Sequence, residues 1–369
     1  MDLTLSREQK ALQQAVREVL EKEATTVARE TEETEAGYSR DLWQKMADLG
    51  WMGVGFPEEY GGTEGDFVDL VVVLEEMGKV IVPGPYITST VCSGRAILDY
   101  GNETQKKAFL PGITAGKLVV APALTRPDRW PEGKRPEERL EVAGSDYLVS
   151  GARIFVPYAN TADWYIWSAG ANDSLLLLID ARSAGIECSL LPTTAGDKQC
   201  LVVMDHVRAP AANVLGEIGK GSEITGRMYE WGALAQSGFI AGLTDRVLRM
   251  AVGYAKKRVQ FDRLIGSFQA IQHQCADMAT DVDEVRFLTY QAAWRMSKQL
   301  PATREVSMAK ARASDAARRV CLLGTKIHGG IGIILDYDMQ LYFRKAKPAE
   351  LAFGDGDFHR EIIARQMGI

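Results

Sequence analysis

The sequence predicts an α+β protein in which a helical N-terminal domain, a middle β-barrel or β-sandwich and a C-terminal four-helix bundle follow one another. Apolar residues recur at helical spacing from the N-terminus to about residue 115. Short β-rich runs separated by turns then fill residues 118–215. Helical spacing returns after Gly221 and continues to the end of the chain. We therefore expect domains at residues 1–116, 117–220 and 221–369.

The N-terminal domain is expected to be helical throughout. Ser6 and Gln9 form a candidate capping box that begins a helix reaching to about Glu33. Pro111 is expected to end the last helix of the domain. The apolar stripe of the first helix consists of Leu12, Val16, Leu20 and Ala24. Further helices are expected at residues 42–49, 66–80, 88–99 and 103–110.

The middle domain is expected to consist of short strands, because runs of β-branched and aromatic residues alternate with glycine- and asparagine-containing turns. Several strands at short spacing favour a small barrel or sandwich. Residues 125–139, rich in proline and charge, are expected to form an exposed loop. The predicted strands are residues 118–124, 140–142, 147–150, 154–157, 164–169, 174–179, 186–191 and 200–204.

The C-terminal domain is expected to be a four-helix bundle, since long helices with short connections pack as antiparallel neighbours. A glycine-rich turn at Gly329, Gly330 and Gly332 follows the third long helix, and a second turn lies at Gly354 and Gly356. Glycine lets a backbone approach a ligand closely, but it also commonly ends helices. The turns are therefore consistent with a cofactor cradle and with simple connectors. The expected helices are residues 222–258, 268–300, 302–325 and 339–349.

Composition argues against several classes of function. The net charge of −6 over 369 residues does not favour nucleic acid or an anionic membrane surface. The five cysteines and four histidines show no metal-ligand spacing, and the scattered cysteines suit a reducing compartment. The N-terminus lacks a signal-peptide pattern, and no apolar run is long enough to cross a bilayer. We expect a cytoplasmic protein without a metal or membrane insertion.

Four segments of the sequence stand out: FPEEYGG at 56–62, VMDHVRAPAANVLGE at 203–217, RVQFDRLIGSFQAIQHQCADM at 258–278 and KIHGGIG at 326–332. They resemble signature segments of the acyl-CoA dehydrogenase family, and they occur in the family's order. The resemblance implies the family's three-domain fold and the FAD-dependent α,β-desaturation of an acyl-CoA thioester. A carboxylate there removes the α-proton, and N5 of the flavin accepts the β-hydrogen as hydride.

The resemblance further implies that one group of residues holds the pyrophosphate and adenine side of a neighbouring subunit's FAD. Arg258 would pair with the pyrophosphate, and Phe261 would pack on the flavin's edge. Lys326 replaces the family's usual glutamine, and Asp262 replaces its usual glycine. The implied cofactor-binding residues are Arg258, Gln260, Phe261, Gln269, Lys326, Ile327, His328, Gly329 and Gly330.

Other family features are altered in this chain. The flavin strand reads APALTRPD at residues 121–128 and lacks the family's glycine–serine turn. Phe155-Val156-Pro157 stands where the family has Trp-Ile-Thr or Trp-Ile-Ser, and proline offers neither a hydroxyl nor an N–H. Ala233 replaces an arginine that lies near CoA and substrate in the family. Several of the residues that would hold a chain's own flavin and substrate are thus replaced.

The position of the family's catalytic glutamate is Phe353, and variant subgroups place the base at the position of Gly232. Glu230 lies two residues earlier, which turns it by about 200° around a helix. It is expected to be a solvated or capping carboxylate. Asp355, just beyond Gly354, is expected to be a turn residue. Either carboxylate would need a local shift to act as the base.

This pattern of retained and lost groups predicts the non-base subunit of a heteromeric enzyme, similar to actinobacterial steroid-type acyl-CoA dehydrogenases. A homologous subunit carrying the base would be its partner in a heterotetramer, with FAD shared across the interface. An acyl-CoA such as a steroid-derived CoA ester would be the substrate, and an electron-transfer flavoprotein or similar protein the acceptor. The alternatives are a self-sufficient dehydrogenase with a relocated base, at Glu230, Asp355 or Asp357, and a catalytically inactive scaffold or binding homologue.

Overall fold

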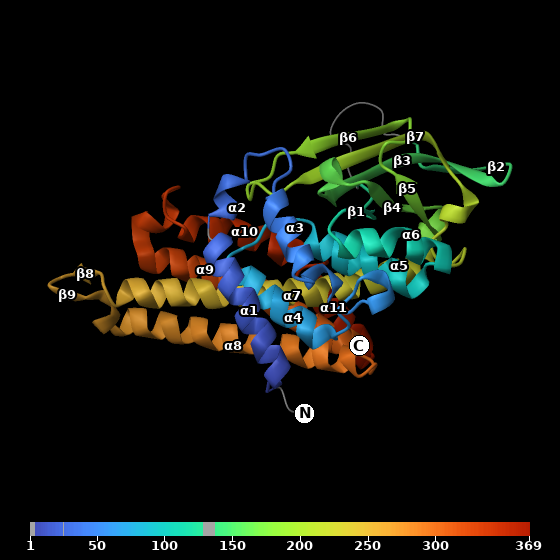
Figure 1. Ribbon diagram of the computed structural model, residues 1–369. Helices are drawn as coiled ribbons and strands as arrows, with labels where there is room; N and C mark the ends of the chain where they lie inside the picture. The colour runs from blue at the N-terminus through green and yellow to red at the C-terminus, as the bar shows by residue number, and fades with distance from the viewer. Residues whose placement is uncertain (1–3, 25, 128–136) are drawn as a thin grey trace. The chain divides into compact units, whose positions relative to one another are not determined.

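The computed structural model describes residues 4–24, 26–127 and 137–369 (Figure 1). The chain forms two compact units, both discontinuous in sequence. The first consists of Met1–Arg29, Gly65–Val82 and Gly232–Ile369, and the second of Glu30–Glu64 and Pro83–Trp231. Helix α7 (Gly221–Ala255) passes from one unit to the other. Most of the predicted loop at 125–139 lies outside the described residues.

The first unit is helical, and its first helix begins as the sequence predicts. The Ser6 hydroxyl accepts a hydrogen bond from the Gln9 amide, and the Gln9 side chain accepts one from the Ser6 amide. The expected end at Glu33 is wrong, because α1 ends at Glu23 and the short α2 (Val27–Glu30) follows. The β-branched Thr26 and Val27 are poorer helix formers than the residues before them. The main helices are α1 (Arg7–Glu23), α4 (Phe67–Lys79), α7, α8 (Gln269–Ser297), α9 (Thr303–His328), α10 (Met339–Leu351) and α11 (Gly356–Met367).

Glycines allow α4 and α7 to pack backbone against backbone. A Cβ added at Gly242 would lie 1.8 Å from the Glu75 carbonyl oxygen, and one at Gly78 would lie 1.9 Å from that of Phe239. Neither position has room for a side chain. The unit's core beside this contact is rich in alanine, which also lets helices approach closely. These packed helices form the rigid frame on which the candidate site is built.

The second unit combines short helices with two sheets. The predicted stop at Pro111 is wrong, because α6 continues through it to Thr114. Proline there removes only one donor near the helix end, and the Thr114 hydroxyl donates to the Leu110 carbonyl 3.1 Å away. The stretch predicted as one helix at 88–99 is a π-helix, η3, followed by α5. The helices are α3 (Arg40–Asp48), η1 (Trp51–Gly53), η2 (Glu58–Tyr60), η3 (Tyr86–Gly94), α5 (Arg95–Tyr100) and α6 (Glu103–Thr114).

The two sheets form a sandwich around one shared core, to which Trp167 and Met204 contribute from opposite sheets. One sheet has the order β1-β4-β5, with β1 and β4 parallel, and the other is antiparallel with the order β2-β3-β7-β6. The runs predicted at 147–150 and 154–157 belong to one strand, β3, which is bulged near Phe155. The strands are β1 (Val120–Ala123), β2 (Arg139–Ala143), β3 (Asp146–Pro157), β4 (Trp164–Ala169), β5 (Leu175–Asp180), β6 (Ile186–Leu191) and β7 (Gln199–Ala209).

The order of helical, β and helical segments confirms the predicted fold class. Within the described ranges, no helix has the combination of length and apolarity that crossing a bilayer requires.

Candidate functional site

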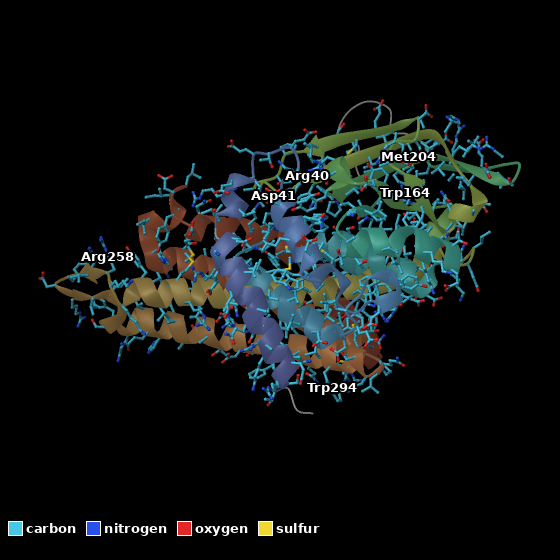
Figure 2. The ribbon with its side chains drawn as sticks, viewed as in Figure 1. Arg40, Asp41, Trp164, Met204, Arg258 and Trp294 are labelled. Carbon is cyan, nitrogen blue, oxygen red and sulfur yellow. The ribbon has the colours of Figure 1, made fainter. Side chains whose placement is uncertain are left out.

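The residues implied to hold a cofactor gather at one end of the helical unit. Helix α7 ends there at Ala255, and α9 ends there at His328. The rings of Tyr254 and His328 stack with centroids 4.5 Å apart, which brings the two helix ends together. A hairpin of β8 (Val259–Gln260) and β9 (Arg263–Leu264) follows α7, and Arg258 lies at its base (Figure 2). We call this region, Tyr254–Gln269 with Lys326–Gly330, the cradle.

The hairpin turn of the cradle is strained and carries an uncovered aromatic ring. Phe261 and Asp262 have φ angles of 52° and 59°, so both lie in the left-handed region. A two-residue turn of this kind favours Asn-Gly, which explains why glycine suits position 262. The Phe261 side chain is 86% exposed. Strain and an exposed ring at a loop tip are typical of a site that contacts a ligand or partner.

The glycine turn of the cradle presents open backbone and one buried acceptor. A Cβ at Gly329 or Gly330 would meet no atom within 4 Å, so the backbone there is accessible. The Nδ1 atom of His328 lies 2.7 Å from the Gly324 carbonyl and donates to it, which leaves Nε2 as an acceptor. Nε2 is buried and has no partner among the described residues. Burial lowers the pKa of His328, so the ring is neutral at pH 7.

The start of α8 adds a site suited to phosphate. Phe268 precedes the helix and offers no capping side chain, and the first turn holds no acidic residue. The partial positive charge of a helix N-terminus favours anions. The Ile265 amide donates to the Arg258 carbonyl at 2.9 Å, which ties the exposed Arg258 to the turn before this helix. Together with the buried acceptor of His328, these groups fit the phosphates and hydroxyls of a dinucleotide.

Phe353 and Gly232, at the positions where the resemblance implies the family's base, lie against each other. Phe353 lies between α10 and α11 with φ of 58°. A Cβ added at Gly232 of α7 would lie 2.4 Å from two atoms of the Phe353 ring. The phenyl ring therefore fills the space beside Gly232. An apolar ring and a glycine thus lie together at the two positions that the resemblance implies for the base.

Two buried side chains hold the turn of Phe353, and the sequence analysis missed both. Lys310 of α9 is fully buried and donates to the carbonyls of Glu350 and Gly354, each at 2.8 Å. Burial lowers the pKa of Lys310 to about 7. His359 Nε2 donates to the Phe353 carbonyl at 2.9 Å, and burial lowers the pKa of His359 to about 4. A lysine on the apolar stripe of α9 was the sequence signal for this contact.

The alternative bases are all engaged elsewhere. Asp355 caps α11 by accepting from the Phe358 amide at 2.9 Å, a bond that lowers its pKa. Asp357 is exposed and pairs with Arg360 at 2.7 Å. Glu230 pairs with Arg227, and its side chain is only 9% exposed. The expectation of a solvated or capping Glu230 is thus wrong, because Arg227 covers it, and its Oε1 atom is buried without a partner.

The segments aligned with the family's own flavin contacts lie in the second unit. Phe155 is 59% exposed at the bulge of β3, and Pro157 pairs with Gln199 of β7. After β1, Arg126 turns toward Asp173 and pairs with it at 2.8 Å. Asp128, at the end of the predicted flavin strand, lies outside the described residues. The described part offers no hydroxyl at position 157, and Ala233 is fully buried in the other unit.

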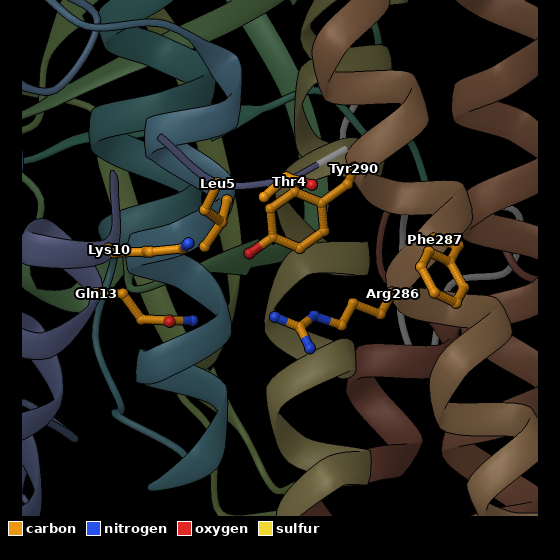
Figure 3. A pocket seen from close by; sticks show the side chains of 7 residues that line it. All are labelled: Thr4, Leu5, Lys10, Gln13, Arg286, Phe287 and Tyr290. Atoms are coloured by element: carbon orange, nitrogen blue, oxygen red, sulfur yellow. The ribbon is translucent and has the colours of Figure 1, made fainter. Parts of the chain in front are cut away.

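A cavity of about 300 Å³ lies elsewhere in the helical unit, between the N-terminal segment and α8 (Figure 3). Its Tyr290 hydroxyl donates to Glu75 at 2.7 Å, and Arg286 lies 3.5 Å from the same carboxylate. Two of its polar side chains are therefore already paired, and none of the predicted site residues lines it. Its lining residues are Thr4, Leu5, Lys10, Gln13, Arg286, Phe287 and Tyr290. No group of three or more potential metal ligands occurs in residues 4–24, 26–127 and 137–369.

Comparison with known proteins places the chain in a family. Residues 6–117 match the model "Acyl-CoA dehydrogenase, N-terminal domain", and residues 219–368 match "Acyl-CoA dehydrogenase, C-terminal domain". The probable acyl-CoA dehydrogenase YngJ of Bacillus subtilis is 31% identical, with 100% of each chain covered.

Two solved structures are similar over almost their whole length. A chain of the ChsE4–ChsE5 complex from Mycobacterium tuberculosis has a TM-score of 0.91 at 28% identity, covering 100% of this chain and 99% of that one. Butyryl-CoA dehydrogenase from Megasphaera elsdenii has a TM-score of 0.92 at 26% identity, with 100% of both chains covered. This chain therefore belongs to the acyl-CoA dehydrogenase family of FAD-dependent oxidoreductases.

Proposed function

We propose that this chain is the non-base subunit of a heteromeric acyl-CoA dehydrogenase and completes the FAD site of a homologous partner subunit. The observation that carries the proposal is the contact between Phe353 and Gly232. These residues occupy the two positions at which the family's base is expected. An aromatic ring packed on a glycine cannot accept the α-proton of a thioester. A second subunit would have to supply that carboxylate.

The cradle supports the second half of the proposal. Arg258 and the start of α8 would hold the pyrophosphate, and the neutral His328 would accept a hydrogen bond from a cofactor hydroxyl through Nε2. Gly329 and Gly330 leave the backbone open to the adenine side. The exposed ring of Phe261 would pack on the flavin's edge. When bound, FAD supplies the acceptor for the hydride that leaves the β-carbon.

One similar structure supports the proposal of a heteromeric partner. A chain of the ChsE4–ChsE5 complex, an assembly of two differently named proteins, is similar over the full length of this chain. We propose a heterotetramer with a base-carrying homologue. The substrate would be a bulky acyl-CoA such as a steroid-derived CoA ester, and the electron acceptor would be an electron-transfer flavoprotein or a similar protein.

One observation favours a self-sufficient enzyme as the second candidate. Glu230 is almost fully buried, and its Oε1 atom has no partner in the described structure. A buried carboxylate with a spare acceptor atom can serve as a base if substrate reaches it. Its pairing with Arg227 argues against this role, because the carboxylate is already engaged in an ion pair. Asp355 is less suited, since its carboxylate is committed to capping α11.

Variants of the co-purified complex test the assignment of the cradle. Arg258→Ala should strip FAD from the complex, because it removes the proposed pyrophosphate contact. Arg249→Ala is the matched control, since it removes another exposed arginine, one that lies on α7 before the cradle begins. Phe353→Ala and Glu230→Gln should leave the FAD content unchanged. Retained FAD in the Arg258 variant would count against the cradle.

Activity of the same variants separates the candidates. In the proposed assembly, Glu230→Gln retains reduction of FAD by the acyl-CoA substrate, because the base belongs to the partner. Loss of that reduction with FAD still bound would favour Glu230 as the base. A complex that holds no FAD in any preparation would instead indicate an inactive scaffold.

A further inference from the structure

Two cysteines lie side by side on neighbouring strands of the four-stranded sheet. Cys188 of β6 is opposite Val202 of β7, while Cys200 of β7 is opposite Leu190 of β6. Opposed residues share a face of a sheet, and alternate residues along a strand share it as well. Cys188, Val202 and Cys200 are therefore on one face, with the two cysteines a single diagonal step apart.

The two thiols differ in access but share a hydrogen-bonded cluster. Strand β6 is at the edge of its sheet, and Cys188 is exposed there. Cys200 is fully buried in the core of the sandwich. The Cys200 thiol donates to Asn160 Oδ1 at 3.8 Å, and the hydroxyl of Tyr165, from the opposite sheet, donates to the Ala159 carbonyl at 3.1 Å. Both side chains influence the ionisation of Cys188. The cluster thus joins one accessible sulfur to one protected sulfur.

The hydrogen bonds make the accessible sulfur the more acidic one. Hydrogen bonding to Cys200 and Tyr165 lowers the pKa of Cys188, and the same contact raises the pKa of Cys200. The thiolate is the nucleophilic form of cysteine. Burial raises the pKa of the other three cysteines, Cys92, Cys275 and Cys321. Exposure and thiolate character therefore coincide at Cys188 among the five cysteines of the chain.

We propose that Cys188 and Cys200 form a redox-active pair that hydroperoxides convert to an intramolecular disulfide. The Cys188 thiolate attacks one oxygen of hydrogen peroxide, and the O–O bond breaks. The departing hydroxide takes up the proton that the thiol lost on ionising, so sulfenic acid and water form. The Cys200 sulfur then attacks the Cys188 sulfur, the S–S bond forms, the S–O bond breaks, and a second water leaves. Two thiols are oxidised and one hydrogen peroxide is reduced to two waters. The inference does not depend on the proposed function.

The fold permits the second step at the cost of a small movement. Diagonal neighbours in an antiparallel sheet have Cα atoms about 7–8 Å apart, slightly beyond the usual limit of about 6.8 Å for a disulfide. Strand β6 is hydrogen-bonded only to β7 within its sheet, so it can shift toward β7 without breaking a second ladder. Such a bond, exposed at an edge, should be readily reduced again by dithiothreitol.

Titration of the reduced full-length protein with hydrogen peroxide tests the pair. The expected result is the loss of two of the five thiols, a mass decrease of two hydrogens, and a cross-linked peptide joining Cys188 and Cys200. Cys188→Ser should abolish the cross-link. Cys200→Ala, which keeps an apolar group in the core, should accumulate a sulfenic acid at Cys188 that dimedone traps. Cys275→Ser is the control and should behave as the unaltered chain.

Three outcomes would overturn the proposal. The first is oxidation of Cys188 no faster than that of Cys275. The second is sulfinic acid at Cys188 without any cross-link to Cys200. The third is the absence of a dimedone adduct in the Cys200 variant while circular dichroism shows that it is folded.

Discussion

At the scale of single residues, the contact between Phe353 and Gly232 carries the proposal that this chain lacks its own base. The two are 121 positions apart in the sequence, and only the folded chain shows that the ring lies on the glycine. The sequence could indicate that each position lacks a carboxylate. It could not indicate that the two positions are one place, because helix packing between α7 and the α10–α11 turn brings them together. Lys310 was missed for the same reason, since its partners are backbone carbonyls 40 and 44 residues away.

Gly242→Ala should destabilise the protein strongly. The added methyl carbon would lie 1.8 Å from the Glu75 carbonyl oxygen, so α4 and α7 would have to separate. We expect a loss of about 3 kcal/mol or more in the free energy of unfolding, measured by urea denaturation. Gly253→Ala in the same helix is the control, because a Cβ there meets nothing within 4 Å. The Gly253 variant should be neutral or more stable by about 0.5–1 kcal/mol. Equal effects of the two variants would contradict the close packing of α4 against α7.

The hairpin turn offers a second test at this scale. Asp262 has φ of 59°, a conformation that glycine adopts without strain. Asp262→Gly should therefore raise the free energy of unfolding by about 0.5 kcal/mol, whereas Asp262→Ala should lower it. Thermal denaturation of the two variants measures the difference. The same sign for both would show that the turn is not strained.

At the scale of elements, local signals predicted how helices begin better than how they end. The capping box of α1 is present as predicted, because its hydrogen bonds lie within four residues. The end of α6 was misjudged because it depends on a contact distant in sequence, whereas α1 ends early where the β-branched Thr26 and Val27 follow it. In α6, Thr114 donates to the carbonyl of Tyr60 as well as to that of Leu110. Strand β3 was similarly split in two, since pairing with β7 carries it through its bulge.

The turn between α10 and α11 should make stability depend on pH through Lys310. Its pKa is about 7 in the folded chain, below the ordinary value of a lysine in the unfolded chain. Between pH 7 and about 10 the unfolded state binds more protons, so stability should rise with pH by up to about 1 kcal/mol per pH unit. Denaturation midpoints across this range measure the rise. Lys310→Met should remove it, whereas Lys347→Met, at an exposed lysine of α10, should keep it. A rise that survives in the Lys310 variant would assign the effect to another group.

For the whole molecule, the sequence pattern predicted the fold class, and the family match agrees with it. The nine residues that the resemblance implies for cofactor binding lie in two segments at one end of the helical unit. The stacked rings of Tyr254 and His328 link these two segments. The buried acceptor of His328 was not foreseeable, because it results from the tautomer fixed by the Gly324 carbonyl. The division of the site between two different subunits remains a prediction about the assembly.

The FAD content of the chain alone and of its complex with a base-carrying homologue tests that prediction most directly. Each preparation is measured for FAD per polypeptide and for bleaching of the flavin by an acyl-CoA under anaerobic conditions. We expect that the chain alone holds no FAD. We also expect that the complex carries FAD on half of its subunits and is bleached. A chain that binds FAD by itself and is bleached by an acyl-CoA would contradict the proposal.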